Sequence, residues 1–163
     1  NSPRINPGAY GMTKYLGEQT LREVSEFLPS ISIRLPGVLG YKSVRNWMSK
    51  LLETAKLGED ITYFSPENKF NNAVHISDLV NFIIKILHQD INGYNAFPIA
   101  ADGQCLIGEI VEEIHTRTGK LSNIRIGDAE KREFLISNTR ANYFGYSPMH
   151  IKEMISKFID ENE

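Results

Sequence analysis

Apolar residues recur at helical spacing in five stretches of the chain, with polar or charged residues between them. This pattern predicts amphipathic helices over residues 10–27, 46–58, 77–89, 106–119 and 149–161. The first ends before Pro29, and Gly58 and Gly119 stop two of the others. In the third helix, Ser77 or Asp78 is suited to cap the N-terminus. Its apolar face is expected to consist of Leu79, Val80, Ile83, Ile84 and Leu87.

Short runs rich in apolar residues lie between these helices. They predict strands over residues 31–36, 60–64, 71–76, 93–100 and 122–127. The Pro-Gly stretch that follows the first strand, residues 36–43, predicts a turn. Helices therefore alternate with strands along the chain, which is the order of an α/β fold. With 163 residues and no repeat, linker or low-complexity tract, the chain is expected to form one domain.

Composition and charge argue against several classes of partner. The chain has 18 basic and 20 acidic residues and a net charge of -2, so no chain-wide field favours nucleic acid or an anionic membrane. The apolar runs are too short and interrupted to span a bilayer. The single cysteine, Cys105, cannot form an internal disulfide, and no Cys/His spacing fits a structural zinc site. We expect a cytoplasmic protein without a metal, in which Cys105 packs as a small hydrophobe.

The first candidate for chemistry is a tyrosine and a lysine four residues apart, Tyr10 and Lys14. On a helix they lie one turn apart on the same face. A neighbouring ammonium favours the phenolate form of a tyrosine, so the pair is suited to proton transfer. The spacing also arises easily by chance, and the alternative is a surface tyrosine and lysine at a helix start.

A second candidate pair, His75 and Asp78, has two interpretations. Taken alone, it suits a metal or acid/base site. A histidine in a buried strand followed by a helix-capping aspartate is the simpler, structural interpretation.

Three longer stretches place the tyrosine and lysine in context. The sequence resembles the extended branch of the short-chain dehydrogenase/reductase superfamily, the NAD-dependent nucleotide-sugar epimerases and dehydratases. "NPGAYGMTKYLGE" resembles the catalytic helix of that family, "SIRLPGVLG" the next strand with its cofactor-contacting turn, and "NNAVHISDLVNFIIKIL" a later strand-to-helix segment. "FLISNTRANYFGYSP" is similar, more weakly, to the segment before the last helix. The matches follow the family order and span nearly the whole chain.

The resemblance implies a fold and a cofactor site. Residues 1–40 would form the end of a Rossmann-type parallel sheet with the catalytic helix, and residues 41–163 mostly a small mixed α/β substrate-binding lobe with returning Rossmann elements. Tyr10 would be the general acid/base during hydride transfer with NAD or NADP. Lys14 would bind the nicotinamide ribose and favour the phenolate. Pro36, Gly37 and Val38 would lie beside the nicotinamide, unless they are an ordinary loop-forming Pro-Gly.

The resemblance also implies where the substrate binds. Arg45, Asn46 and Trp47 would approach it, although the same residues suit a helix start with a packed tryptophan. Asn71 stands where many relatives place an arginine that contacts the nucleotide diphosphate, and asparagine lacks that charged, bidentate grip. Either Arg45 or another cation compensates, or the substrate is not a conventional nucleotide sugar.

The sequence departs from the family in one large respect. It contains no Gly-rich phosphate loop after a strand, and only nine residues precede Tyr10. We therefore expect the C-terminal half of a larger enzyme, which alone binds dinucleotide weakly and does not turn over. Its expected partners are the missing N-terminal half, a nucleotide sugar and, in the complete enzyme, a second copy. Two alternatives stay open: a non-catalytic binding or assembly module, and a reductase of non-sugar carbonyl compounds.

Overall fold

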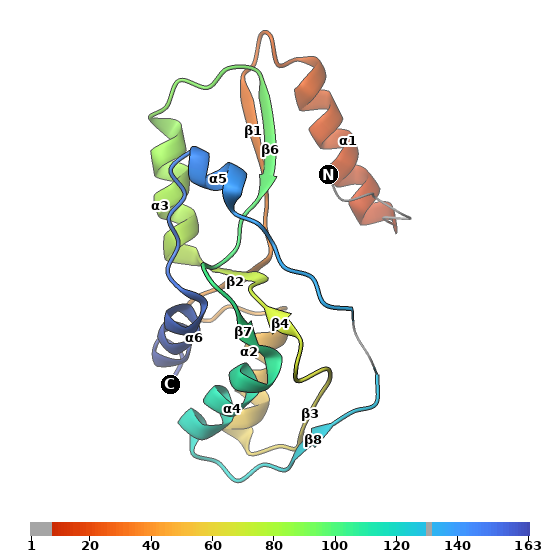
Figure 1. Ribbon diagram of the computed structural model, residues 1–163, viewed down its shortest axis with the longest axis vertical. Coiled ribbons are helices and arrows are strands. Elements are labelled where there is room, and N and C mark those ends of the chain that lie inside the picture. The colour runs from red at the N-terminus through yellow and green to blue at the C-terminus, as the bar shows by residue number, and fades with distance from the viewer. Residues whose placement is uncertain (1–7, 130–131) are drawn as a thin grey trace.

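The computed structural model describes residues 8–129 and 132–163 (Figure 1). Helices alternate with short strands, as the hydrophobic pattern predicts. In chain order the elements are α1 (Gly8–Glu23), β1 (Ser30–Arg34), β2 (Gly37–Leu39), α2 (Trp47–Leu57), β3 (Ile61–Tyr63), β4 (Lys69–Phe70), β5 (Ala73–His75), α3 (Ile76–Leu87), β6 (Tyr94–Pro98), β7 (Cys105–Leu106), α4 (Ile107–Thr118), β8 (Ile124–Ile126), α5 (Thr139–Tyr143) and α6 (Ile151–Asp160).

The described strands form pairs, most of them parallel. β1 pairs with β6, β2 with β5 and β3 with β8 in parallel, whereas β4 and β7 are antiparallel. Only Leu35 and Pro36 separate β1 from β2, so the chain passes directly from the first parallel pair into the second. Parallel pairs connected through helices confirm the predicted α/β class.

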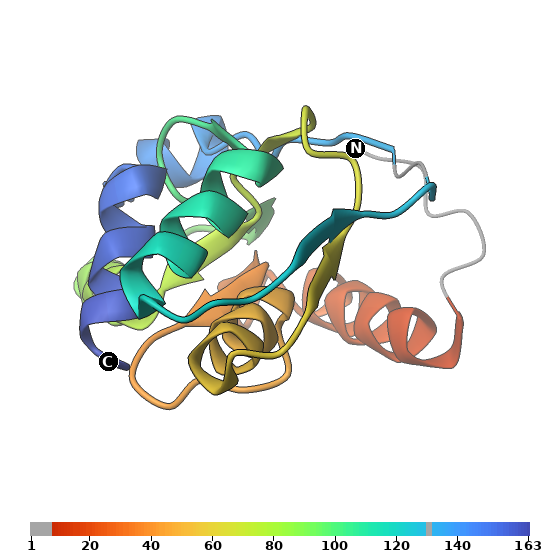
Figure 2. The ribbon, with the colours of Figure 1, turned by 90° about the horizontal axis from the view of Figure 1, so that it is seen from below.

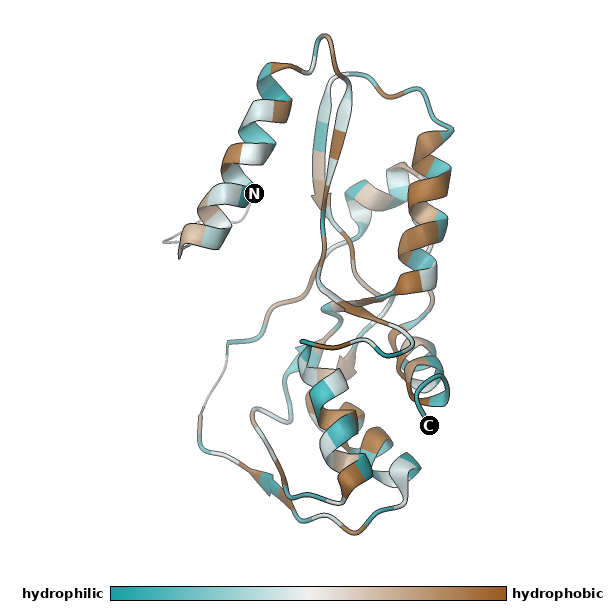
Figure 3. Cartoon of the chain, turned by 180° about the vertical axis from the view of Figure 1, so that it is seen from behind, coloured by the Kyte–Doolittle hydropathy of each residue, from teal (hydrophilic) through white to brown (hydrophobic). Residues whose placement is uncertain are grey.

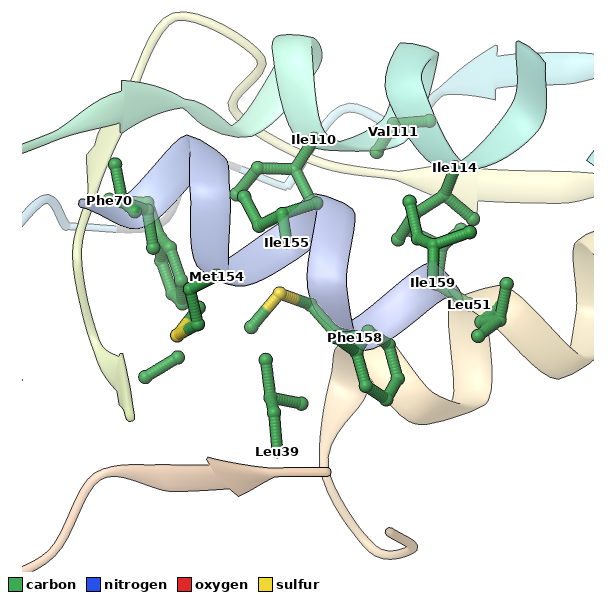
Figure 4. Packing of buried hydrophobic residues seen from close by; sticks show 14 of the residues in the cluster. Leu39, Leu51, Phe70, Ile110, Val111, Ile114, Met154, Ile155, Phe158 and Ile159 are labelled. Carbon is green, nitrogen blue, oxygen red and sulfur yellow. The ribbon is translucent and has the colours of Figure 1, made fainter. Parts of the chain in front are cut away.

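The larger of two hydrophobic clusters lies among α2, α4 and α6. Helix α6 contributes five buried residues, Ile151, Met154, Ile155, Phe158 and Ile159. Figure 4 shows Phe158 and Met154 of α6 directed toward Leu39 of β2, while Ile155 and Ile159 meet Ile110 and Ile114 of α4. Figure 2 shows α1 lying apart from this cluster. α6 therefore ties α2 and α4 to β2.

The second cluster packs α3 and α5 against the β1–β6 pair. Phe82 of α3 lies 6.2 Å from Phe97 of β6 and 4.8 Å from Tyr146, measured between ring centroids. The Tyr146 hydroxyl donates to the Ala100 carbonyl at 2.9 Å. Burial of this phenol raises its pKa above the ordinary value, because the phenolate would lose its hydration.

Several predicted elements differ in their bounds. Gly37–Leu39, predicted within a turn, is strand β2, because its backbone pairs with Ala73–His75. The first helix ends at Glu23 rather than near residue 27, and no residue of it is fully buried. The short elements β4, β7 and α5 were not predicted from the hydrophobic pattern, because two to five residues carry too little periodicity. None of the described helices has the length and apolar character that a membrane span needs.

The predicted apolar face of α3 is wrong for all of its residues except Leu79. Leu79, Phe82 and Ile86 are the buried residues of this helix, whereas four of the five predicted ones, Val80, Ile83, Ile84 and Leu87, are exposed. Figure 3 shows that apolar residues cover most of α3. A helix that is apolar nearly all round has two possible packing ridges, and only the position of the sheet decides between them. Its N-cap is also not Ser77 or Asp78: the His75 ring accepts from the Ser77 amide.

Candidate functional site

Helix α1 is fastened to the carboxyl end of β1 by one ion pair. The Arg34 guanidinium donates to the two carboxylate oxygens of Glu18, at 2.9 Å from Nε and 2.8 Å from Nη2. This bidentate, charge-assisted contact holds the pKa of Arg34 above its ordinary value. Arg22 adds a second contact, with its guanidinium 5.4 Å from the ring centroid of Tyr94 on β6. The two contacts set the position of α1 along the β1–β6 pair.

That position carries Tyr10 and Lys14 beyond the carboxyl ends of the strands. At a rise of about 1.5 Å per residue, Lys14 lies about 6 Å and Tyr10 about 12 Å along the helix from Glu18. In Figure 1 α1 leans away from β1 toward this end of the helix. The carboxyl edge of parallel strands is where open α/β sheets bind ligands. The Glu18–Arg34 ion pair therefore lies at the edge expected for ligand binding, and the part of Tyr10 and Lys14 in such a site stays a prediction.

The two predicted catalytic side chains are also close to each other. The Lys14 Nζ lies 5.3 Å from the centroid of the Tyr10 ring. The Tyr10 side chain is 76% exposed, so its hydroxyl is accessible to a ligand. The structure thus brings a cation against an accessible phenol, which is the arrangement that the spacing predicts.

Removing the Arg34 anchor should release α1. Because no residue of α1 is fully buried, we expect Arg34→Ala to raise hydrogen exchange of the α1 amides at least tenfold, with little change in β6. Exchange followed by mass spectrometry measures this directly. Arg125→Ala is the matched control, because it removes an exposed pair with Asp60 at 3.6 Å that holds no helix. Unchanged exchange in α1 would show that other contacts hold the helix.

The predicted cofactor-contacting residues lie where β1 passes into β2. Pro36, Gly37 and Val38 are half-buried, and Gly37 and Val38 belong to β2. A Cβ placed on Gly37 would lie 3.7 Å from both the Asn46 Cβ and the Asn72 carbonyl oxygen. These are ordinary van der Waals distances, so the Cβ direction of Gly37 faces the chain's own residues.

The predicted substrate residues form the start of α2. Asn46 is the N-cap of α2: its Oδ1 accepts from the Ser49 amide at 2.8 Å, and its Nδ2 donates to the Val38 carbonyl at 3.3 Å. The Trp47 ring packs edge-on against Phe70 at 5.3 Å between centroids and remains 39% exposed. The helix-start interpretation is therefore correct for Asn46, while part of the Trp47 ring stays available to a ligand.

Arg45, Asn46 and Trp47 line one open groove of about 810 Å³. It runs along α2 to the end of α6, and its other charged lining residues are Lys42, Lys50, Glu53 and Lys56. Together with Arg45, the groove is lined by four cationic side chains and one carboxylate. This excess of positive charge favours an anionic ligand.

Asn71, predicted to contact the substrate, binds the backbone of Ile136 within the chain. Its side chain is buried, its Nδ2 donates to the Ile136 carbonyl at 2.8 Å, and its Oδ1 accepts from the Ile136 amide at 2.9 Å. The neighbouring Asn72 donates from Nδ2 to the Phe134 carbonyl at 3.1 Å, while its buried Oδ1 has no hydrogen-bond partner among the residues that the structure describes. The two asparagines hold the extended segment 134–136 against β5.

His75 lies in a network that joins β5 to the end of α6. Its Nδ1 lies 2.7 Å from the Ser77 hydroxyl and its Nε2 3.1 Å from the Glu161 carboxylate. Asp78, its predicted companion, instead accepts from the Met149 amide at 3.1 Å. These contacts favour the structural interpretation of the pair. Within the described residues, no cluster of three or more His, Cys, Asp or Glu side chains is placed to hold a metal ion.

Cys105 is buried, as expected for a packed small hydrophobe. Burial raises the pKa of its thiol to about 11, because the thiolate would lose its hydration. At neutral pH it is therefore a thiol.

A comparison with protein families matches residues 4–100 to one described as NAD dependent epimerase/dehydratase family. The chain belongs to this family. The matched region contains α1 with Tyr10 and Lys14, the β1–β2 passage, the start of α2 and the β5–α3 segment. No curated protein matches the chain.

Solved structures of epimerase/dehydratase enzymes share the fold. UDP-glucose 4-epimerase from Thermotoga maritima, solved with UDP-glucose, has a TM-score of 0.77 at 18% identity over 93% of this chain and 52% of its own. The Bordetella bronchiseptica enzyme WbmF, in complex with NADH, has a TM-score of 0.79 at 20% identity over 99% of this chain and 54% of its own. dTDP-glucose 4,6-dehydratase from Bacillus anthracis, in complex with NAD, has a TM-score of 0.71 at 18% identity over 94% of this chain and 51% of its own.

These likenesses confirm the Rossmann-like α/β fold of this epimerase/dehydratase family member. They also show that the chain spans about half the length of the solved structures it matches. Two features of the site were not predicted from the sequence, the Glu18–Arg34 anchor and the contacts of Asn71 with Ile136. Their partners are 16 and 65 residues apart, and no local pattern marks such contacts.

Proposed function

We propose that this chain is the C-terminal, substrate-binding half of an NAD(P)-dependent enzyme that acts on sugar nucleotides as an epimerase, dehydratase or reductase. One observation carries the proposal: the Lys14 ammonium lies against the accessible Tyr10 ring on α1, the helix that Glu18 ties to the carboxyl end of β1. The family supports NAD(P) dependence, and UDP-glucose is bound in one structure of the same fold. The isolated chain is proposed to be inactive.

The residues present fit the nicotinamide end of a dinucleotide. The Tyr10 hydroxyl and the Lys14 ammonium are donors suited to ribose hydroxyls, and the half-buried residues 36–38 would lie beside the nicotinamide ring. When bound, the cofactor supplies the hydride acceptor and donor. Pro36 and Val38 would flank the ring on either side of Gly37. The chain contains no Gly-rich loop to hold the pyrophosphate, so the other half of the enzyme would contribute it.

In the proposed mechanism Tyr10 moves one proton. Its phenolate accepts the proton of a substrate hydroxyl as the carbon bearing it is oxidised, and the phenol returns the proton when the carbonyl is reduced. Lys14 stabilises the phenolate form by its positive charge and binds the nicotinamide ribose. A positioned acid/base group contributes about 10²–10⁴ in rate.

The substrate is proposed to lie along the start of α2. Arg45 supplies a bidentate donor for a phosphate, Asn46 lies beside β2, and the exposed part of Trp47 offers a stacking face. Asn71 as a substrate contact stays a prediction; its amide already holds Ile136, so a ligand would have to share it. We also propose that the complete enzyme is a homodimer that pairs through α1, which exposes Met12, Tyr15 and Leu16.

The test is a substrate screen of the longer enzyme that contains this chain. Hydride transfer with NAD and NADP should be seen with nucleotide sugars and not with simple aldehydes or ketones. The reverse pattern would favour the reductase of non-sugar carbonyls, which the replacement of an arginine by Asn71 permits. Calorimetry with this chain alone should show weak or no dinucleotide binding. Activity with neither substrate class would favour a non-catalytic module.

A further inference from the structure

The loop between β2 and α2 has an unusual backbone. Lys42 and Arg45 both adopt left-handed conformations, with φ of 53° and 69°, although neither is a glycine. Side chains of L residues disfavour this region, and such residues persist only where surrounding contacts hold them. Two of them within four positions indicate a loop whose shape is imposed from outside.

The residue that imposes this shape is Asn162, just beyond α6. Its Oδ1 accepts from the Lys42 amide at 2.8 Å, and its Nδ2 donates to the Gly40 carbonyl at 3.2 Å. The same Nδ2 donates to the Phe158 carbonyl at 2.8 Å, which orients the amide on its own helix. From α2, the Lys56 ammonium donates to the Asn162 backbone carbonyl. One side chain thus joins the loop to the end of α6.

The end of α6 that carries Asn162 is itself fixed. The Glu161 carboxylate lies 3.1 Å from Nε2 of the buried His75 ring. Phe158 is buried in the core beside β2. A rigid support at this place can hold the loop in one conformation. Within the loop, the Ser43 amide donates to the Gly40 carbonyl at 3.1 Å, so Gly40 receives both the internal and the external bond.

Asn162 and the loop line the same groove. This groove contains Arg45, Asn46 and Trp47, the residues proposed to bind the substrate, together with Lys42 and Lys56. We propose that Asn162 is a positioning residue for substrate binding: it holds the loop so that Arg45 is already directed along the groove before a phosphate-bearing substrate arrives. The inference rests on the proposed function. Preorganisation of this kind lowers the ordering cost of binding.

The first arm of the test reads the loop without a substrate. In this chain, Asn162→Ala removes both loop contacts, whereas Asn162→Asp keeps the acceptor for the Lys42 amide and loses the donor to Gly40. Hydrogen exchange resolved by NMR should rise at least tenfold for the Lys42 and Ser43 amides in Asn162→Ala. Asn162→Asp should retain more protection at Lys42. Amides of α2 and α4 should not change; equal exchange in all variants would overturn the proposal.

The second arm measures binding in the longer enzyme. Asn162→Ala should raise KM for the nucleotide sugar about tenfold, the size of effect expected when a loop and one or two side chains must be ordered on binding. It should leave kcat nearly unchanged, because Asn162 touches no reacting group. In Asn162→Asp the rise in KM should be smaller than in Asn162→Ala. Glu153→Gln, an exposed change on the same helix, is the control and should leave both constants unchanged.

The two arms separate the possible failures. A loop that exchanges faster while KM stays unchanged would overturn the positioning role and leave the proposed function intact. If the wild-type longer enzyme converts no nucleotide sugar, the proposed function is wrong, and the proposed role of Asn162 in substrate binding is then wrong as well. That failure is distinct, because it appears before any substitution is made.

Discussion

Tyr10→Phe in the longer enzyme is expected to lower turnover about 10²–10⁴-fold, the range for loss of a positioned acid/base. The substitution removes only the phenolic oxygen and leaves the ring beside Lys14. Substrate KM should change little, because the ring and its contact remain and the lost interaction belongs to the proton-transfer step. Steady-state kinetics with the preferred nucleotide sugar, at several pH values, measure both constants.

Tyr143→Phe provides a closely matched control. Tyr143 is also 76% exposed, and the Arg140 guanidinium lies 5.1 Å from the centroid of its ring, much as Lys14 lies over Tyr10. Its substitution should leave turnover within twofold, because α5 lies on the other side of the β1–β6 pair from α1 (Figure 1). Normal turnover in Tyr10→Phe would remove Tyr10 from the mechanism, whatever the control shows.

Phe158→Ala is expected to destabilise this chain by about 3–5 kcal/mol, the usual cost of emptying a large aromatic site in a core. Phe158 is 1% exposed, and it lies in the cluster that joins α6 to β2 and α2 (Figure 4). Domains are stable by only about 5–15 kcal/mol, so much of the stability should be lost. Urea denaturation followed by circular dichroism measures the change.

Leu121→Ala is the control for this second prediction. Leu121 is 99% exposed, so removing its side chain should change the free energy of unfolding by less than about 0.5 kcal/mol. If Phe158→Ala cost no more than this control, α6 would not pack in the core as described. The support proposed for Asn162 would then be lost as well.

Local chemistry explains what was predicted correctly. α2 and α4 end at Gly58 and Gly119, whose φ values of 71° and 61° are left-handed and favour glycine. The pairing of Tyr10 with Lys14 follows from helical spacing alone, since residues four apart share a face. Such features depend only on residues within one or two helical turns of each other, so they can be predicted from the local sequence.

The packing ridge of α3 shows where sequence reasoning fails. The apolar pattern predicted Leu79, Val80, Ile83, Ile84 and Leu87 inside. The structure buries Leu79 but exposes the other four, and it buries Phe82 and Ile86 instead. Either ridge is apolar enough to be buried. The free-energy difference between burying one ridge and burying the other therefore lies in how each packs against the β1–β6 pair and Tyr146. Similarly, the backbone of Gly37–Leu39 is a strand only because Ala73–His75 lies beside it.

The amino-acid sequence by itself determined the α/β order of elements, the glycine helix stops, the family and the spacing of Tyr10 and Lys14. Only the tertiary structure decided that Glu18 binds Arg34, that Asn71 holds Ile136 and that Asn162 holds the loop after β2. The physical reason is the sequence separation of the partners: positions 71 and 136 are 65 residues apart, and positions 42 and 162 are 120 residues apart. Hydrogen bonds over such separations form only after the chain has folded around a core, and no local propensity encodes them.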